Sequence, residues 1–224
     1  MIPVDAEKFV LQYKLQDPSL SGSAASGLEM LLGFIAEDTN LSDLRWAAYM
    51  LATVKHECAN LWQPVEERGT GSGRPYGLPA TVAAPDGTTY TNSYYGRGYV
   101  QLTWRYNYDR MGQALGLGNA LVLHPDQALE PRISYKIMSY GMRNGSFTGK
   151  SLQDYIHDGA CDYFNARQVI NGLDQAALIQ SYAVSIEALL RANLTANSVS
   201  SQAAAVGSGI RRFAHFIGGL FSKP

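Results

Sequence analysis

Residues 93–108 read SYYGRGYVQLTWRYNY. The two glycines allow the backbone to approach a ligand closely, and the aromatic rings around them have faces that can stack on sugar rings. Arg97, Gln101, Thr103 and Asn107 supply side chains that make directional hydrogen bonds. This composition predicts a ligand-binding segment, and the alternative is a packed turn of the same composition.

Carboxylates are concentrated upstream, where residues 55–69 read KHECANLWQPVEERG. An apolar stripe that ends near Glu57 predicts a helix closing at that residue, and Glu66 and Glu67 follow beyond Pro64. Hydrolysis of an acetal needs one acid to protonate the leaving oxygen and one carboxylate to activate water or attack carbon. These residues are therefore candidates for such a pair, and the alternative is a solvated helix end followed by an exposed acidic pair.

Zinc chemistry is not expected from this segment. His56 and Glu57 match the start of the HExxH zinc motif, but its second histidine is replaced by Asn60. We therefore discard a zinc site here.

The order of residues in 93–108 closely resembles the signature [YF]-[YF]-G-R-G-x-x-Q-L-[TS]-x-x-x-N-Y of glycoside hydrolase family 19. This is the chitinase family whose phage and bacterial members include endolysins. His56-Glu57 resembles the family's first catalytic carboxylate, and PVEERG at 64–69 resembles the bacterial P-I-x-E-Y-G around the second. NARQVING at 165–172 resembles the substrate-cleft segment R-x-[VI]-N-G, so the resemblance runs from about residue 45 to 190.

The resemblance implies a role for individual residues. Glu57 would be the general acid, Glu67 the general base and Thr103 a holder of the attacking water, with Glu66 as the alternative base. Glu67 is preferred because it keeps the family's spacing to Gly69. The family mechanism is inverting, which requires carboxylates roughly 6.5–9.5 Å apart and implies that no metal and no cofactor is needed. The expected substrate-binding residues are Gln101, Tyr106, Asn107 and Asn171, with Arg97 shaping the cleft floor, Tyr95 among the stacking aromatics, and Trp62 beside Leu61 desolvating the acid.

Apolar periodicity predicts a mainly α chain. The Asp86-Gly87 pair predicts a hairpin within the loop-rich stretch 69–98, and Ser42 is the expected N-cap of the third helix. The resemblance implies a lysozyme-like α+β bilobal domain whose small β-hairpin region lines a substrate cleft. The expected helices are 5–15, 28–35, 43–57, 106–115, 132–143 and 176–192.

A single catalytic domain is expected at 1–194, with a helical N-terminal part at 5–40 and a catalytic core at 41–194. Residues 195–224 read as a Ser/Ala-rich linker followed by a short cationic amphipathic helix. That helix is expected either to contact anionic membrane lipid or lipopolysaccharide or to dock onto the domain. Cys58 and Cys161 are expected to be small buried residues, with a single disulfide as the alternative.

The chain carries a formal net charge of -1, and its sequence pI is about 6.4. Because it offers no general attraction for phosphate backbones, nucleic acid is not an expected partner, and a monomer is the default. The first residues do not resemble a secretory signal, so we expect synthesis in the cytoplasm. Action on the cell wall would then follow release through a separate membrane pore.

Three functions from different classes remain. The low cysteine content and the expected site of synthesis favour an endolysin that hydrolyses the β-1,4 bond between N-acetylmuramic acid and N-acetylglucosamine in peptidoglycan. A chitinase acting on β-1,4-linked N-acetylglucosamine is the alternative. A sugar-binding protein that has lost catalysis is the third, and the joint presence of Glu57, Glu67 and Thr103 argues against it.

Overall fold

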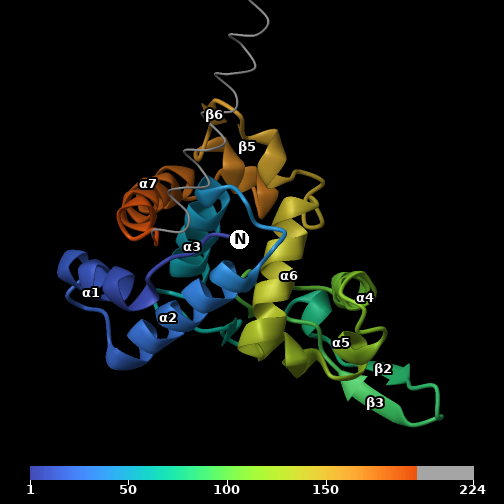
Figure 1. Cartoon of the computed structure of the whole chain (residues 1–224). Helices are drawn as coiled ribbons and strands as arrows, with labels where there is room; N and C mark the ends of the chain where they lie inside the picture. The colour runs from blue at the N-terminus through green and yellow to red at the C-terminus, as the bar shows by residue number, and fades with distance from the viewer. Residues whose placement is uncertain (196–224) are drawn as a thin grey trace, which may run out of the picture.

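The computed structural model describes residues 1–195, and this part of the chain is mainly helical, as predicted (Figure 1). The strands are short and form three separate antiparallel pairs, β1 with β4, β2 with β3 and β5 with β6. The helices are α1 (Ala6–Gln16), α2 (Gly22–Glu37), α3 (Leu44–Glu57), α4 (Arg105–Ala114), α5 (Ala120–Leu123), α6 (Pro131–Arg143) and α7 (Ala176–Ala192). The strands are β1 (Val65–Glu66), β2 (Ala80–Ala83), β3 (Thr89–Asn92), β4 (Arg97–Gly98), β5 (Ile156–His157) and β6 (Ala160–Cys161). Short 3-10 helices are η1 (Pro75–Gly77), η2 (Pro125–Leu129), η3 (Leu152–Asp154) and η4 (Asn165–Val169).

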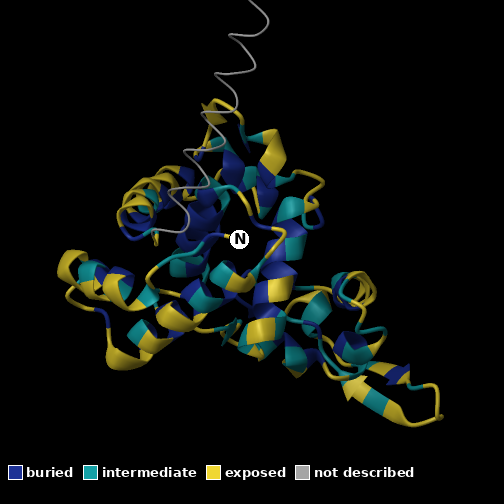
Figure 2. Cartoon of the chain, in the orientation of Figure 1, coloured by how far each residue is buried: buried dark blue, intermediate teal, exposed yellow. Residues whose placement is uncertain are grey.

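Helix α3 lies in the centre of the molecule and carries Glu57 as its last residue (Figure 1). Every residue from Ala47 to Val54 is buried, so α3 has no polar face over two turns, as expected of a helix surrounded by other elements. Figure 2 shows this helix almost entirely in the buried colour. Burying one side chain such as Leu51 contributes about 1.5–3 kcal/mol to folding, so the position of Glu57 is fixed by the core.

The N-cap of α3 differs from the prediction. Asp43, and not Ser42, caps the helix, with its carboxylate accepting a hydrogen bond from the Arg45 backbone N–H at 2.9 Å. The same carboxylate pairs with the Arg45 guanidinium at 2.6 Å. Because one carboxylate makes both contacts, aspartate stabilises this end better than the neighbouring serine hydroxyl would.

The predicted hairpin is confirmed. Strands β2 and β3 pair in register from Ala80 with Asn92 to Ala83 with Thr89, and Gly87 takes a φ of +85° in the turn between them. The hairpin projects from the body and exposes most of its side chains (Figures 1 and 2). It therefore contributes a surface rather than a core.

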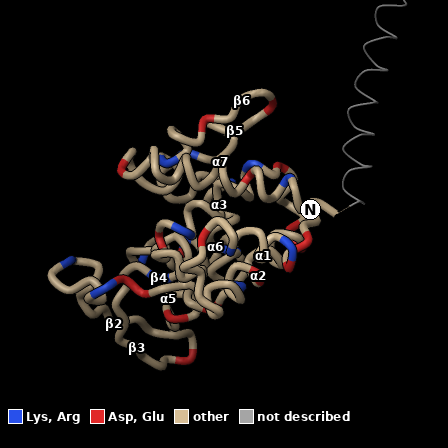
Figure 3. Tube along the Cα trace, turned by 90° about the vertical axis from the view of Figure 1, so that its left-hand side faces the viewer, with Lys and Arg blue, Asp and Glu red and all other residues tan. Residues whose placement is uncertain are grey.

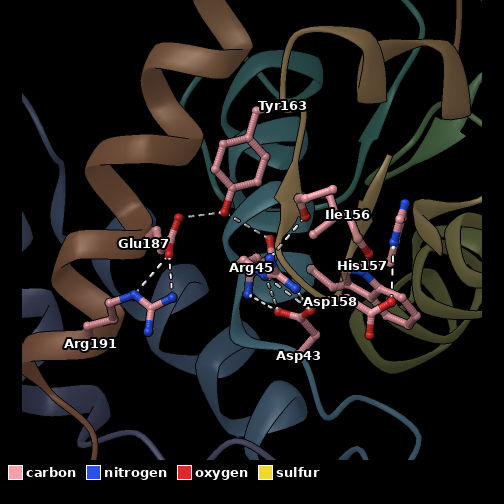
Figure 4. A network of polar contacts seen from close by, with 10 residues as sticks. Asp43, Arg45, Ile156, His157, Asp158, Tyr163, Glu187 and Arg191 are labelled. Atoms are coloured by element: carbon pink, nitrogen blue, oxygen red, sulfur yellow. Dashed lines mark hydrogen bonds and ion pairs between the residues drawn. The ribbon is translucent and has the colours of Figure 1, made fainter. Parts of the chain in front are cut away.

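A polar network fixes the β5–β6 hairpin against α3 and α7 (Figure 4). The Arg45 guanidinium of α3 donates to the Ala160 carbonyl at 3.0 Å. The Tyr163 hydroxyl donates to the Glu187 carboxylate of α7 at 2.8 Å. Since η4 follows directly after Tyr163, this network also sets where η4 lies beside α3.

The two ends of the described chain lie next to each other. Val4 forms an antiparallel bridge with Leu194, and the Asp5 N–H donates to the Asn193 carbonyl at 2.9 Å. No helix within residues 1–195 is both long and apolar enough to cross a membrane. The predicted linker and amphipathic helix lie outside the described residues, except for Thr195.

The cysteines depart from the prediction. Cys58 is buried, but Cys161 is exposed on β6, and both are free thiols. The prediction that both are buried is therefore wrong for Cys161, because β6 is a two-residue strand of a short hairpin and leaves this side chain exposed.

Candidate active site

Segment 96–99, a short stretch around β4, holds both parts of the chain that carry the candidate catalytic carboxylates. The Cys58 thiol, directly after Glu57, contacts the Gly98 carbonyl with an S···O distance of 3.9 Å. On the other side, the Glu67 N–H donates to the Gly96 carbonyl at 2.8 Å, continuing the β1–β4 pairing. The helix end and the strand end that bear the carboxylates therefore meet on one segment.

Both glycines of this segment are closely packed, and Gly98 in particular has no room for a side chain. A Cβ on Gly96 would lie 2.7 Å from the Gln101 side-chain oxygen, and one on Gly98 would lie 2.6 Å from the Ser134 hydroxyl oxygen. Gly98 also has a φ of +86°, which favours glycine. The Gly-x-Gly pattern in the sequence thus reflects close packing around the floor of the site.

Glu57 is held by a buried arginine. Arg167 of η4 pairs with Glu57 at 2.7 Å, and its guanidinium also donates to the Asp174 carbonyl at 3.0 Å. The Arg167 side chain is only 4% exposed and that of Glu57 is 17% exposed. The second oxygen of Glu57 accepts no hydrogen bond from residues 1–195, so it is available to a ligand.

Glu67 is held differently, through both of its oxygens. The Tyr76 hydroxyl donates to one oxygen at 2.8 Å, and the Gly96 N–H donates to the other at 3.0 Å. The hydrogen bond to Glu67 raises the pKa of Tyr76. Glu66 is exposed and accepts a hydrogen bond only from the Tyr95 hydroxyl at 3.1 Å within the described chain. Of the two adjacent carboxylates, Glu67 is the one fixed to segment 96–99.

Thr103 and Gln101 lie on the same side of this segment. A Cβ on Gly96 would be 3.3 Å from the Thr103 hydroxyl oxygen, which places Thr103 beside the backbone that holds Glu67. The Gln101 amide donates to the Val65 carbonyl at 3.0 Å and to the Gly98 carbonyl at 3.1 Å. The amide N–H groups of Gln101 are thus used to join β1 to β4.

The prediction of substrate binding is wrong for two residues, because their side chains are buried. Trp62 is fully buried, packs edge-on against Tyr13 at 5.4 Å between ring centroids, and donates to the Asn60 side chain. It can neither stack on a sugar nor line the site. Leu61 was expected, together with Trp62, to desolvate the catalytic acid Glu57, but its side chain is 52% exposed.

Arg97 is likewise buried, at 3% exposure, so it does not reach a sugar. Its guanidinium donates to the Ser93 carbonyl and the Tyr108 hydroxyl, lies 3.6 Å from the Tyr95 ring centroid and pairs with Asp126 at 3.0 Å. These contacts support the floor from below. Burial raises the pKa of Tyr108 above its ordinary value, so this hydroxyl stays neutral beside the arginine.

The other predicted substrate residues lie at the start of α4 and after η4. Tyr106 is 65% exposed, and the Asn107 side chain donates to the Thr103 carbonyl at 2.8 Å. Asn171 is exposed, and within the described chain its side chain bonds only to the Gly172 N–H. Tyr95 is half-buried between Arg97 and Glu66.

The loop between the two carboxylates contains unusual backbone. Ala59, Asn60 and Trp62 have φ values of +50°, +63° and +57°. Asp17 holds this loop by accepting from the Asn60 amide at 3.0 Å and pairing with Lys55 at 3.0 Å. Hydrogen bonds from Ser19 and Lys55 lower the Asp17 pKa to about 2.

Arg167, Tyr76 and Asp17 were not among the predicted site residues. The only sequence signal for any of them was the arginine within NARQVING. No group of three or more His, Cys, Asp or Glu side chains arranged to hold a metal occurs in residues 1–195.

Comparison with known proteins decides the family. The family model for chitinase class I, glycoside hydrolase family 19, matches residues 37–155, just over half of the chain. The chain belongs to glycoside hydrolase family 19. This confirms the resemblance drawn from segments 93–108 and 55–69.

Curated relatives are similar over shorter stretches. An acidic 26 kDa endochitinase of Solanum lycopersicum is 51% identical over 47 residues, 20% of this chain and 19% of that protein. The inactive chitinase-like protein 1 of Hevea brasiliensis is 40% identical over 79 residues, 35% of this chain and 23% of that protein. Endochitinase At2g43610 of Arabidopsis thaliana is 34% identical over 145 residues, 62% of this chain and 47% of that protein. The matches thus span between a fifth and a half of these relatives' lengths.

The fold is shared with a solved member of the family. The crystal structure of a bacterial family 19 chitinase is 24% identical, with a TM-score of 0.52, and the match covers 84% of this chain and 94% of that one. The expected lysozyme-like, mainly α fold of family 19 is therefore confirmed.

Proposed function

We propose that this family 19 chain hydrolyses β-1,4-linked N-acetylhexosamine polymers. The observation that carries the proposal is that Glu67 and Cys58, the residue after Glu57, both contact segment 96–99, while the two carboxylates are held by different partners. Glu57 faces a buried arginine and has one oxygen free, while Glu67 is fixed through both oxygens by Tyr76 and Gly96. Two carboxylates in unlike surroundings are what an acid and base pair requires.

The proposed mechanism assigns one task to each group. Glu57 donates a proton to the leaving glycosidic oxygen, and Arg167 positions its carboxyl group. Glu67 takes a proton from a water molecule that attacks the anomeric carbon from the opposite face, and the Thr103 hydroxyl helps to hold that water. The product then has inverted configuration at the anomeric carbon, and no metal or cofactor takes part.

Chitin-type glycan is the substrate best supported by the relatives, since three of those described above are named as chitinases or endochitinases. Peptidoglycan is a second candidate because of exposed arginines near Glu67 and at the start of α4. Arg68, Arg74 and Arg105 are exposed and form no salt bridge within residues 1–195. Arg74 also acts electrostatically on Tyr76, which places its charge next to the base.

Peptidoglycan carries carboxylates on its lactyl groups and peptide stems, whereas chitin is uncharged, so unpaired arginines favour the former. Figure 3 shows basic and acidic positions close together on the side that carries β2 and β4. Under this second candidate the chain is a wall-lytic endolysin that reaches the wall after release through a membrane pore. Contact of the segment after Thr195 with anionic lipid would belong to the same proposal.

The test uses colloidal chitin and purified peptidoglycan side by side. The full chain is expected to release soluble sugars from at least one of them, and mass spectrometry of the new reducing ends identifies the bond that is cut. Glu57→Gln keeps the shape of the side chain but removes the acid, so it is expected to fold normally and lose at least about a hundredfold in kcat. Wild-type activity in Glu57→Gln, or no release from either polymer by the native chain, would reject the proposal.

A further inference from the structure

Three aromatic side chains form a row that starts at the proposed base. The Tyr76 hydroxyl donates to Glu67, and the Tyr76 ring meets the Trp104 ring edge-on at 5.2 Å between centroids. Trp104 in turn stacks with Tyr106, with centroids 6.3 Å apart and an interplanar angle of 25°. Trp104 is 39% exposed and Tyr106 is 65% exposed, so large ring surfaces face solvent beside the carboxylate.

Trp104 is held in an unfavourable backbone conformation. Its φ of +75° and ψ of 132° lie close to a region that glycine occupies and other residues avoid. The Trp104 N–H donates to the Tyr94 carbonyl at 2.9 Å, and its carbonyl accepts from the Asn107 N–H at 2.9 Å. The backbone here would be more stable with glycine, and the ring is partly exposed, so neither the backbone nor burial in the core explains a tryptophan.

Tyr106, the last residue of this row, also lines a cavity. This cavity has a volume of about 450 Å³ and lies between strand β2 and helices α4 and α5. Its wall combines apolar groups with polar side chains that can bond to hydroxyl and N-acetyl groups. Among its lining residues are Val82, Arg105, Tyr106, Asp109, Asn119 and Val122.

We propose that Trp104, together with Tyr106, forms a sugar-stacking platform, and that the glycan runs from the carboxylates across Trp104 into this cavity. The inference rests on the proposed function, because it is that function which supplies a β-linked N-acetylhexosamine chain as the occupant. The platform adds to that function binding sites for sugars on one side of the bond that is cut. Apolar ring faces beside a few directional polar groups match the amphipathic faces of such sugars.

The experiment measures binding and not turnover. Binding of N-acetylglucosamine oligomers of two and six sugars is measured by calorimetry on the full chain carrying Glu57→Gln, with and without Trp104→Gly. One lost stacking contact is expected to weaken binding of the six-sugar oligomer about tenfold, and to leave the two-sugar oligomer within about twofold. Trp104→Phe, which retains a ring, is expected to keep most of the affinity.

Thermal unfolding separates a platform from a structural residue. Because glycine suits the backbone at this position, Trp104→Gly is expected to retain or raise the Tm while it weakens binding. Leu11→Ala on α1 is the matched control, since it removes an apolar side chain that is 61% exposed. It should leave binding of both oligomers unchanged.

Two results would overturn the platform. One is unchanged affinity of Trp104→Gly for the six-sugar oligomer, and the other is a fall in Tm with equal loss for both oligomers. Failure of the proposed function is a separate outcome, because it would appear as absence of hydrolysis by the native chain whether or not oligomers bind.

Discussion

Adjacent glutamates at the end of β1 have different surroundings. Side chains alternate along an extended chain, so Glu66 and Glu67 point in opposite directions. Glu67 is tied to Tyr76 and to the Gly96 backbone, and Glu66 lies exposed against Tyr95. A proton-accepting carboxylate needs a fixed position, which only Glu67 has.

Isosteric changes at the two positions provide the test. Glu67→Gln is expected to lower kcat by about a hundredfold or more, because the amide cannot accept a proton from water. Glu66→Gln, the matched control, is expected to keep kcat within about twofold, since it alters only an exposed contact. Initial rates on a soluble N-acetylglucosamine oligomer measure both, and the reverse pattern would transfer the role of base to Glu66.

Two tryptophans show how far the burial of a single residue could be predicted from the sequence. Trp62 and Trp104 both lie next to motif residues, and nothing in their sequence neighbourhood says which one is buried. The packing of Trp62 depends on Tyr13, which is 49 positions away. Arg167 was missed for the same reason, since its contact with Glu57 joins residues 110 positions apart.

Helices were predicted more reliably than the loop that joins the carboxylates. The limits of α3 and α7 follow from apolar periodicity, which is a local property, and the β2–β3 turn follows from Asp86-Gly87. In the loop after α3, three non-glycine residues have left-handed backbone conformations. The loop keeps these conformations because Asp17 and the buried Trp62 hold it in place. These contacts join residues that are distant in sequence, so no local sequence pattern predicts them.

This loop leads to a prediction about pH. The Asp17 pKa is lowered from 3.8 to about 2 in the folded chain, so the stability that this carboxylate contributes is present above pH 4 and is lost as the pH falls toward 2. Asp17→Asn is expected to lower Tm by about 3–6 °C at neutral pH, and the difference should shrink between about pH 4 and pH 2.

Calorimetric or circular dichroism melts over that range would measure the effect. Asp158→Asn is a suitable control, because the Asp158 side chain is 97% exposed and lies 3.5 Å from the Nδ1 atom of its sequence neighbour His157. A difference between wild type and Asp17→Asn that persists undiminished at pH 2 would contradict the assigned role of the ion pair and hydrogen bonds.

Charge is a property of the whole molecule, and its placement bears on the choice of substrate. The chain is nearly neutral overall, so composition gave no hint of an anionic partner. Arg68 and Arg74 near Glu67, and Arg105 at the start of α4, are nevertheless exposed and lack salt-bridge partners in the described part of the chain. Where these charges lie relative to the candidate active site depends on the fold, which composition does not reveal.

If peptidoglycan is cut, replacing Arg68, Arg74 and Arg105 together with glutamine is expected to lower kcat/KM on peptidoglycan by about tenfold, since each exposed contact contributes up to about 1 kcal/mol. Activity on uncharged chitin oligomers should change by less than about twofold. The charge-matched control is Lys8→Gln, Lys14→Gln and Lys136→Gln, all exposed and on other helices. Equal losses on both substrates, or an equal loss in the control, would remove the argument for an anionic glycan.

The bridge between Val4 and Leu194 has a consequence for engineering. Because Val4 and Leu194 run antiparallel side by side, a short peptide that joins Thr195 to Met1 in place of residues 196–224 would close this part of the chain into a ring, at the expense of the contact between the terminal amine and the Leu41 carbonyl. New termini opened at the tip of the β2–β3 hairpin would then yield a circular permutant. Any cargo fused there would sit at the rim of the sugar-facing surface instead of behind α1.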